Sequence, residues 1–433
     1  MTQILDDRKR EISEQLAKVC NTSAEHLEDA YPCPELQAEQ FTASTQAGNL
    51  LHFNFVYALT SSEPGAIELL KRAVNAVCSR NPILRSKVVQ LNDKTGDQRT
   101  YYAVLRQGVP WNIFSDLESY CKDSVGKSVR SGDALSSFAI SADRTHFVWT
   151  IHHSLYDGWS LGLLAQEIGS HLHAGKILGL PPRPSYSKFI ASLRGPPSDT
   201  ASEFWADLLR GYYGPVLKPS RSLPTTNIFR KGKIPVNEAH RGKRCVAERI
   251  QAAWALALLE WFQAADIMFL TYSTGRNCLV DGVSEMTGPC LCIVPLRAKF
   301  DPADSVKDFI DRVGSLSRLS LEHEHAGLQA LRKEVQPDRR PNHVLNITPA
   351  AQDPGNLPGM ELQNSGGLHK KYFDWVAHVS IGEEEMQWSL CADEDRLPVA
   401  AVDFLCRRFP ELILSCVTIE EASTLSLASM LEK

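Results

Sequence analysis

Hydrophobic positions recur along the chain with two periods, that of a strand and that of a helix. Residues 51–57 carry a hydrophobic side chain at every second position, which predicts a strand. The hydrophobic stripe in residues 67–77 follows Pro64 with helical spacing, which predicts a helix that begins near this proline. A similar stripe predicts an amphipathic helix over residues 8–20. The first half of the chain therefore begins with helix, strand and helix.

A second strand signal precedes the most unusual stretch of the chain. The run FVWTI, residues 147–151, is rich in β-branched and aromatic side chains and predicts a buried strand. Residues 161–175 then show the pattern of a helix. Prolines and glycines gather in residues 179–200, and this stretch is the best candidate for a linker.

The second half repeats the mixture of helix and strand. We expect helices over residues 250–261, 305–323 and 399–417, and strands within residues 266–277, 343–349 and 378–393. At 433 residues the chain is long enough for two lobes. The predicted fold class is therefore α/β, or α+β, with one lobe over residues 1–180 and a second over residues 181–433.

The composition of the chain indicates which kinds of binding partner can be excluded. Hydrophobic residues make up 43% and charged residues 22% of the chain, which are ordinary values for a globular protein. The formal net charge is −5, so no overall basic field favours nucleic acid or an anionic membrane. We therefore expect neither nucleic acid nor membrane as a partner.

The cysteines show no metal-binding spacing. There are eleven, an odd number, and the one close pair, Cys290 and Cys292 in GPCLCIV, has the pattern of a strand in or near a core. We therefore expect no metal and a reduced, cytoplasmic protein. The N-terminus is charged, and no stretch approaches the roughly 18 apolar residues that span a bilayer. No export or membrane anchoring is expected.

The stretch WTIHHSLYDGWS, residues 149–160, carries the candidate chemistry. His152 and His153 lie where the predicted strand leaves the core, and a neutral imidazole is the usual general base near neutral pH. Asp157 would orient such a base or hold the loop. Gly158 would allow a sharp turn and close approach of a substrate, and a helix that begins near Ser160 would direct N–H groups at the site.

The sequence of residues 149–160 is also compatible with a purely structural role for this stretch. Both histidines would then be satisfied core or turn residues, and Asp157 with Gly158 would form a turn before a helix. Other catalytic patterns fit poorly, because the sequence has no Gly-x-Ser-x-Gly elbow, no Walker loop and no His-Glu-x-x-His helix.

HHSLYDGWS resembles the His-His-x-x-x-Asp-Gly signature of condensation domains of nonribosomal peptide synthetases. Further motifs that resemble those of this family follow the family's order: YPCPELQ at residues 31–37, RNPILR at 80–85, YSTGR at 272–276, GPCLCIVPLR at 288–297, and EHEHAGLQALRK at 322–333, the last as in fungal members. The resemblance covers about residues 24–420.

Four departures from the family pattern bear on subtype. Asn81 stands where the family has His, Cys292 or a neighbour stands where Asn is usual, and Thr274 separates Ser273 from Gly275. The closing Arg-Asp-x-x-x-Asn-Pro motif of bacterial members has no clear counterpart. Tyr156 and Trp159 beside Asp-Gly resemble the fungal members.

The resemblance implies two chloramphenicol-acetyltransferase-like lobes arranged as a V around a central tunnel. It implies no directly bound cofactor and no metal, because the substrates arrive on the 4′-phosphopantetheine of peptidyl carrier (thiolation) domains. Upstream carriers, a downstream carrier in some arrangements and adjacent synthetase modules are the implied partners.

The resemblance also assigns roles to individual residues. His153 is the catalytic candidate and Gly158 would offer a backbone N–H to the developing oxyanion. His152 and Asp157 would mainly hold the loop. Arg276 would be the ionic partner of Asp157, although a solvated loop arginine is the alternative. Ser160 and Trp159 are candidates for lining the tunnel, with helix capping as the alternative for Ser160.

The leading functional interpretation is amide bond formation, in which an amine attacks a carrier-bound acyl or peptidyl thioester. A close alternative is a terminal condensation domain that releases the peptide by intramolecular macrocyclisation. The family often has Ser at the first His of the motif in that variant, so His152 favours ordinary condensation. A plant-type CoA-dependent acyltransferase lacks support because no Asp-Phe-Gly-Trp-Gly motif is present. An epimerisation domain and a non-catalytic carrier-docking domain are the remaining alternatives.

Overall fold

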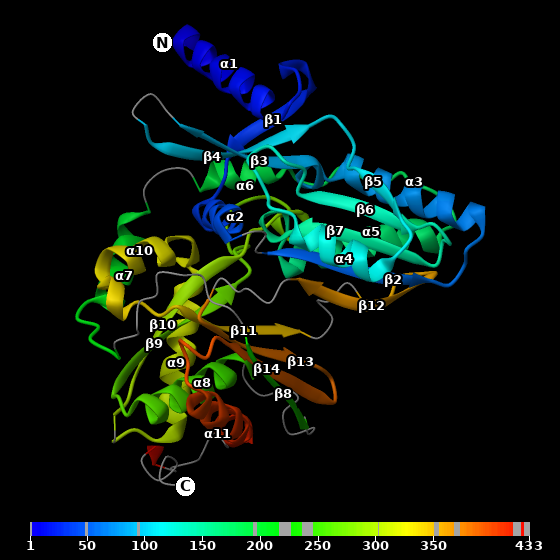
Figure 1. Ribbon diagram of the computed structural model, residues 1–433. Coiled ribbons are helices and arrows are strands. Elements are labelled where there is room, and N and C mark those ends of the chain that lie inside the picture. Colours follow the sequence, from blue (N-terminus) through cyan, green and yellow to red (C-terminus); the bar gives the residue numbers. More distant parts are fainter. Residues whose placement is uncertain are drawn as a thin grey trace. The chain divides into compact units, whose positions relative to one another are not determined.

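The computed structural model gives a mixed architecture of helices and sheets (Figure 1). The structure describes residues 2–47, 51–92, 96–193, 197–215, 227–235, 246–301, 303–349, 355–367, 373–418 and 426–427.

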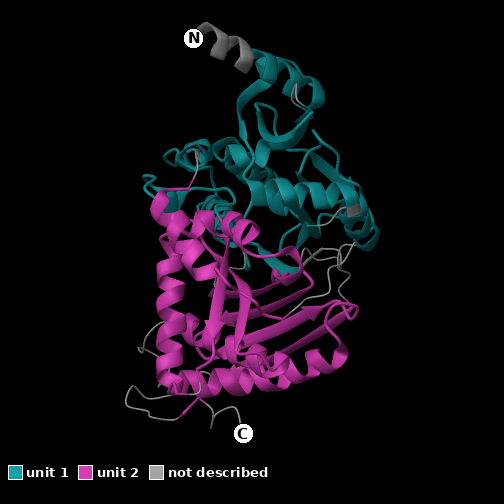
Figure 2. Cartoon of the chain, turned by 90° about the vertical axis from the view of Figure 1, so that its left-hand side faces the viewer, with its two compact units in different colours: residues 1–194, 278–290, 351–368 teal, residues 195–277, 291–350, 369–433 magenta. Residues whose placement is uncertain are grey.

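The chain divides into two compact units, which Figure 2 shows in two colours. Unit 1 comprises Met1–Arg194, Cys278–Cys290 and Ala351–Leu368, and unit 2 comprises Gly195–Asn277, Leu291–Ala350 and His369–Lys433. This division differs from a single boundary after residue 180, because residues 181–194 and two segments of the second half belong to unit 1.

The helices of unit 1 are α1 (Thr2–Val19), α2 (Glu35–Ala47), α3 (Pro64–Arg80), α4 (Leu117–Gly126), α5 (Gly158–His173) and α6 (Tyr186–Ser192). Its strands are β1 (Leu27–Pro32), β2 (His52–Leu59), β3 (Ser86–Asn92), β4 (Gln98–Leu105), β5 (Trp111–Phe114), β6 (Ser136–Ser141), β7 (His146–His152) and β12 (Met360–Gly367).

Unit 1 contains a three-stranded sheet in the order β1-β4-β3 and a five-stranded sheet in the order β12-β2-β7-β6-β5. In the larger sheet β2 pairs antiparallel with β7 on one side and with β12 on the other. The predicted helix after Pro64 is confirmed as α3, whose hydrophobic stripe is buried. The predicted strand FVWTI is confirmed as part of β7, and its five residues are all buried. This buried strand gives the following loop a rigid base.

The prediction of a linker over residues 179–200 is wrong for the part that forms α6, and its residues 194–196 lie outside the described residues. Tyr186, Phe189 and Ile190 of this helix are buried in the hydrophobic core of unit 1. Their spacing puts the three side chains on one helix face, and burial of that face stabilises the helix despite the prolines before it.

The helices of unit 2 are α7 (Asp199–Leu209), α8 (Val246–Phe262), α9 (Val306–Leu321), α10 (Gly327–Glu334) and α11 (Val399–Thr418). Its strands are β8 (Ile228–Pro235), β9 (Asp266–Ser273), β10 (Cys292–Lys299), β11 (His343–Pro349), β13 (Trp375–Ile381) and β14 (Glu385–Ala392). They form a six-stranded sheet in the order β10-β9-β11-β13-β14-β8.

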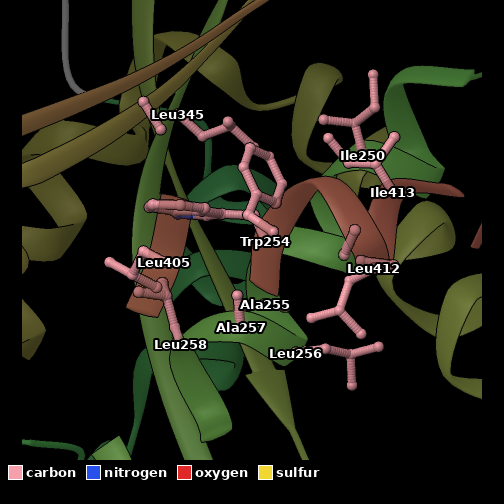
Figure 3. Close-up of a cluster of buried hydrophobic side chains, with 14 of the residues drawn as sticks. Ile250, Trp254, Ala255, Leu256, Ala257, Leu258, Leu345, Leu405, Leu412 and Ile413 are labelled. Carbon is pink, nitrogen blue, oxygen red and sulfur yellow. The ribbon is translucent and has the colours of Figure 1, made fainter. Parts of the chain in front are cut away.

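The core of unit 2 lies where α8 and α11 pack together beside the sheet. Figure 3 shows Trp254 and Leu258 of α8 with Leu405 and Leu412 of α11 and Leu345 of β11. All five are nearly inaccessible to solvent. Unit 2 thus has its own hydrophobic core.

Candidate active site

The HHSLYDG loop connects a buried strand to a long helix within unit 1. β7 ends at His152, a short 3₁₀ turn spans His153–Leu155, and α5 begins at Gly158. The predicted order of strand, histidine pair and helix is therefore confirmed. Tyr102 of β4 donates a hydrogen bond from its hydroxyl to the carbonyl of Ser154 and holds the turn from the side of the smaller sheet.

His152 is completely buried and both of its ring nitrogens are hydrogen-bonded. Nδ1 accepts the backbone N–H of Ser154 at 3.1 Å and lies 2.8 Å from the hydroxyl of the same residue. Nε2 lies 2.8 Å from the hydroxyl of Ser44 in α2. Because Nδ1 is an acceptor, the neutral ring carries its proton on Nε2 and donates it to Ser44. His152 therefore has the contacts of a residue that holds the loop.

His153 is in a different environment from its neighbour. It is only partly buried, and its backbone N–H donates to the carbonyl of Leu51 at 2.9 Å. Its ring stacks on that of Tyr156, with 4.6 Å between centroids and an angle of 15° between planes. Phe53 meets the same ring edge-on at 5.9 Å. Two aromatic neighbours thus fix the ring plane of His153 while part of the residue remains accessible to solvent.

Asp157 is the N-cap of α5 and is almost fully buried. Its Oδ1 accepts the backbone N–H of Ser160 at 2.7 Å, and the hydroxyl of Ser160 accepts the N–H of Asp157 at 3.0 Å. This reciprocal pair is a capping box. The other carboxylate oxygen, Oδ2, accepts the backbone N–H of Cys290 at 2.9 Å. The contacts of the fully buried Ser160 support its interpretation as a capping residue.

Several hydrogen bonds join the segment Cys278–Cys290 to the rest of unit 1, and the bond from the N–H of Cys290 to Asp157 is one of them. The indole N–H of Trp159, a residue 39% exposed, donates to the carbonyl of Ser284 at 2.8 Å. The hydroxyl of Tyr186 donates to the carbonyl of Pro289 at 2.8 Å. The start of α5 therefore holds both the histidine loop and this distant segment.

Gly288 of the same segment explains why a glycine stands at the first position of GPCLCIVPLR. Its φ is +125°, a value that other residues rarely adopt. A Cβ at this position would also lie 2.6 Å from Cδ2 of Tyr186, which is too close. Another residue at position 288 would therefore strain the backbone and displace Tyr186.

Gly158 is the first residue of α5. The first N–H groups of a helix have no acceptor within the helix, and together they carry a partial positive charge. Asp157 accepts the N–H of Ser160, and its carbonyl accepts that of Leu161 at 2.9 Å. The N–H groups nearest the start of the helix, including that of Gly158, are those suited to an anionic oxygen.

Arg276 lies in unit 2, in the loop after β9. Its Nη1 donates to the carbonyl of Thr274 at 3.1 Å. Asp157 belongs to unit 1, so the ion pair between Asp157 and Arg276 stays a prediction.

Two residues of the RNPILR motif, Asn81 and Arg85, make structural contacts within unit 1. Asn81 is completely buried, its Nδ2 donates to the carbonyl of Val77 at 2.8 Å, and its Oδ1 accepts the hydroxyl of Thr287 at 2.9 Å. Asn81 therefore ties α3 to the segment Cys278–Cys290. Arg85 binds Glu28 at 2.7 Å, and this bond holds the pKa of the Glu28 carboxyl below its usual value.

Sequence reasoning missed Ser44, Tyr102 and His52. His52 of β2 meets His152 edge-on, with 5.0 Å between ring centroids, and burial lowers the pKa of His52 to about 4. Ser44 lies 108 positions before the histidine that it contacts. No local pattern indicates such partners, because the sheet and α2 bring them together only in the folded chain.

No disulfide joins cysteines in the described part of the chain. Cys290 is buried but precedes β10, which begins at Cys292, so the predicted strand over both residues is wrong for Cys290. Within the described ranges, no three side chains of His, Cys, Asp or Glu gather as metal ligands. No helix of the described residues is long and apolar enough to cross a membrane.

Comparison with known proteins places these features in a family. The family model described as condensation domain matches residues 27–429. Nonribosomal peptide synthetase 1 of Ajellomyces capsulatus is 29% identical over 78% of this chain, and nonribosomal peptide synthetase ecdA of Aspergillus rugulosus is 26% identical over 94%. The aligned regions are 18% and 6% of those two proteins, so the chain spans a small part of the relatives it matches.

Solved structures support the same assignment at the level of fold. The starter condensation domain of rhizomide synthetase RzmA has a TM-score of 0.73 at 15% identity, with 93% of this chain and 99% of that chain covered. A protein named CT has a TM-score of 0.72 at 19% identity, with 93% and 92% covered. The predicted fold class is therefore confirmed, and because the family model covers nearly the whole sequence, the chain belongs to the condensation domain family.

Proposed function

We propose that this chain acts as a condensation domain that forms an amide bond between an amine and a carrier-bound acyl or peptidyl thioester. Condensation domains are amide-bond-forming acyltransferases. The observation that carries the proposal is the difference between the two histidines. His152 is buried with both nitrogens hydrogen-bonded, whereas His153 is partly accessible and held by aromatic contacts.

In this proposal His153 positions the attacking amine and takes its proton. The amine lone pair attacks the thioester carbonyl, the C–S bond breaks, and the phosphopantetheine sulfur leaves with a proton. Stacking on Tyr156 keeps the imidazole in one plane. This lowers the entropic cost of bringing the amine and the base into the reactive orientation. The base moves one proton from nitrogen to sulfur and ends the reaction unchanged.

The start of α5 would stabilise the charge that develops on the carbonyl oxygen. The backbone N–H of Gly158 is suited to this oxygen, and the positive end of the helix adds to its effect. Asp157 contributes indirectly, because its capping box fixes the first turn of the helix. An ion pair with Arg276 would further hold Asp157.

The implied partners are peptidyl carrier domains, which present substrates on 4′-phosphopantetheine, and adjacent synthetase modules. The curated relatives are much longer than this chain, which is consistent with a domain that works beside others. The proposal includes no metal, no cofactor of the domain's own, and a cytoplasmic location.

The test uses purified protein with a panel of peptidyl thioesters, each with and without a free amine acceptor, and detects products by mass spectrometry. A linear amide that requires the acceptor supports condensation. A cyclic product without acceptor supports macrocyclisation instead.

Two variants complete the experiment. His153→Ala should lose product, while His146→Ala, at the other end of β7, should keep it. Normal product formation by folded His153→Ala protein would overturn the proposed role of this histidine. Carrier binding without product from any thioester would favour a docking domain.

A further inference from the structure

A thiol and an imidazole form a close pair in unit 2. Cys292 is the first residue of β10, and its Sγ lies 3.1 Å from Nδ1 of His325. His325 lies in the short turn Glu324–Ala326 and its side chain is 26% exposed. Cys292 is also only partly buried. Both groups are therefore within reach of a small molecule from solvent.

The surroundings of His325 favour its action as a base toward Cys292. The backbone of Gly275 also favours the protonated form of the ring, because it accepts a hydrogen bond from it. Burial lowers the pKa of His325, so the ring is neutral near pH 7. The carboxylate of Glu324, buried and fixed by the N–H of Asn277 at 3.1 Å, lies 3.9 Å from Nε2. A negative charge there stabilises the imidazolium that proton transfer would form.

Three other thiols in the described part of the chain have a raised pKa. Burial raises the pKa of Cys78 and Cys416 to about 12, and that of Cys406 to about 11. A thiol with a raised pKa has little thiolate at neutral pH and reacts slowly. Cys406 is partly buried like Cys292 and belongs to the same unit, so it is a suitable internal control.

We propose that Cys292 and His325 form a nucleophilic pair that accepts acyl groups from thioesters. His325 takes the thiol proton, the thiolate attacks the thioester carbonyl, and the C–S bond to the leaving thiol breaks. The leaving sulfur takes the proton from the imidazolium, and a new thioester remains on Cys292. One thioester replaces another, so no oxidant or reductant is needed. The choice of thioesters as donor rests on the proposed function, whereas the reactivity of the thiol does not.

The experiment incubates the full chain with the thioester of hexanoic acid and N-acetylcysteamine at pH 7. Peptide mapping by mass spectrometry locates the acyl group, and its release by neutral hydroxylamine identifies a thioester. We expect Cys292 to be acylated at least about tenfold faster than Cys406, because the imidazole increases the thiolate fraction. His325→Gln should slow acylation of Cys292 by about tenfold or more. Cys292→Ser should abolish the label at this position.

Three controls keep the result interpretable. Melting temperatures of the variants establish that they fold. Iodoacetamide, which attacks any accessible thiolate, should show the same preference for Cys292 and the same dependence on His325. The reaction is repeated in His153→Ala protein, where Cys292 should still be acylated even when amide formation is lost.

The proposal is overturned if Cys292 and Cys406 are acylated at equal rates, or if folded His325→Gln protein is acylated as fast as wild type. Alkylation of Cys292 without any acylation would also overturn it. Loss of amide formation with normal acylation of Cys292 would instead concern the function proposed for His153.

Discussion

A buried histidine in unit 2 predicts how stability responds to acid. His343 lies in β11 and is 2% exposed, and its ring stacks on Trp375 with 4.2 Å between centroids. Neither ring nitrogen of His343 has a hydrogen-bond partner among the described residues. Burial lowers the pKa of His343 to about 3. The folded protein therefore holds this ring neutral, because protonation would place an unpaired charge in the core.

The magnitude follows from the difference between the folded and unfolded states. An unfolded histidine has a pKa of about 6.5, so between about pH 6.5 and about pH 3 the unfolded chain binds one more proton at this site. Stability therefore falls as the pH is lowered through this range and is fully retained above it. The linkage relation gives a loss of about 2 kcal/mol between pH 7.5 and pH 5.

The assay compares wild-type protein with His343→Phe, which keeps an aromatic ring against Trp375 but takes up no proton. Unfolding in urea is measured at pH 7.5 and at pH 5. Hydrogen exchange of peptides from β11 and β13 monitors the unfolding, because these strands belong to unit 2. Wild type should lose about 2 kcal/mol more than the variant between the two pH values. His52 of unit 1 titrates equally in both proteins and cancels in the comparison. His146→Phe controls for the removal of a histidine from the other unit.

Equal pH dependence in wild type and His343→Phe would refute the reasoning. It would mean that the imidazole of His343 reaches a partner or water when it is protonated.

Three further predictions concern the loop and its supports. His153→Ala should lower the rate of product formation by about 10²–10⁴-fold in protein that still folds, measured with the thioester assay. Ser44→Ala should cost about 1–3 kcal/mol in urea unfolding, because it leaves Nε2 of His152 buried without its partner. Asp157→Ala and Arg276→Ala should each destabilise the protein, and the double variant should lose less than the sum if the two side chains share an ion pair.

For each of these three predictions, one experimental result would contradict the stated reason. Unchanged turnover in folded His153→Ala protein would exclude base catalysis by this residue. Unchanged stability of Ser44→Ala would mean that the bond to His152 is replaced by water, and Ser170→Ala, on an exposed part of α5, serves as its control. Additive losses for Asp157 and Arg276 would show that they do not touch, leaving Asp157 with its bonds to Ser160 and Cys290.

Local sequence patterns predicted the elements of the site but not the contacts among them. The strand before His152 and the helix after Asp157 each have a periodicity that is complete within a few residues. The bond from Asp157 to Cys290 joins positions 133 apart, and no periodicity indicates it. Such contacts depend on the path of the whole chain, which local propensity does not determine.

The error over α6 has a different origin. The prolines and glycines of residues 179–200 outweighed a short apolar pattern at Tyr186, Phe189 and Ile190, which share one helix face. That spacing was a usable signal for a buried helix. It was missed because a helix of seven residues offers only two turns in which to recognise the period.

The pairing of β2 with β12 constrains how the protein is made. During synthesis, β2 and β7 leave the ribosome long before residues 360–367, which complete the sheet along the other edge of β2. Until then β2 has an unpaired edge and carries the hydrophobic side chains Phe53, Phe55 and Tyr57 on one face, and such an edge attracts other strands. The unit that carries both histidines therefore cannot finish folding until more than three quarters of the chain has been translated.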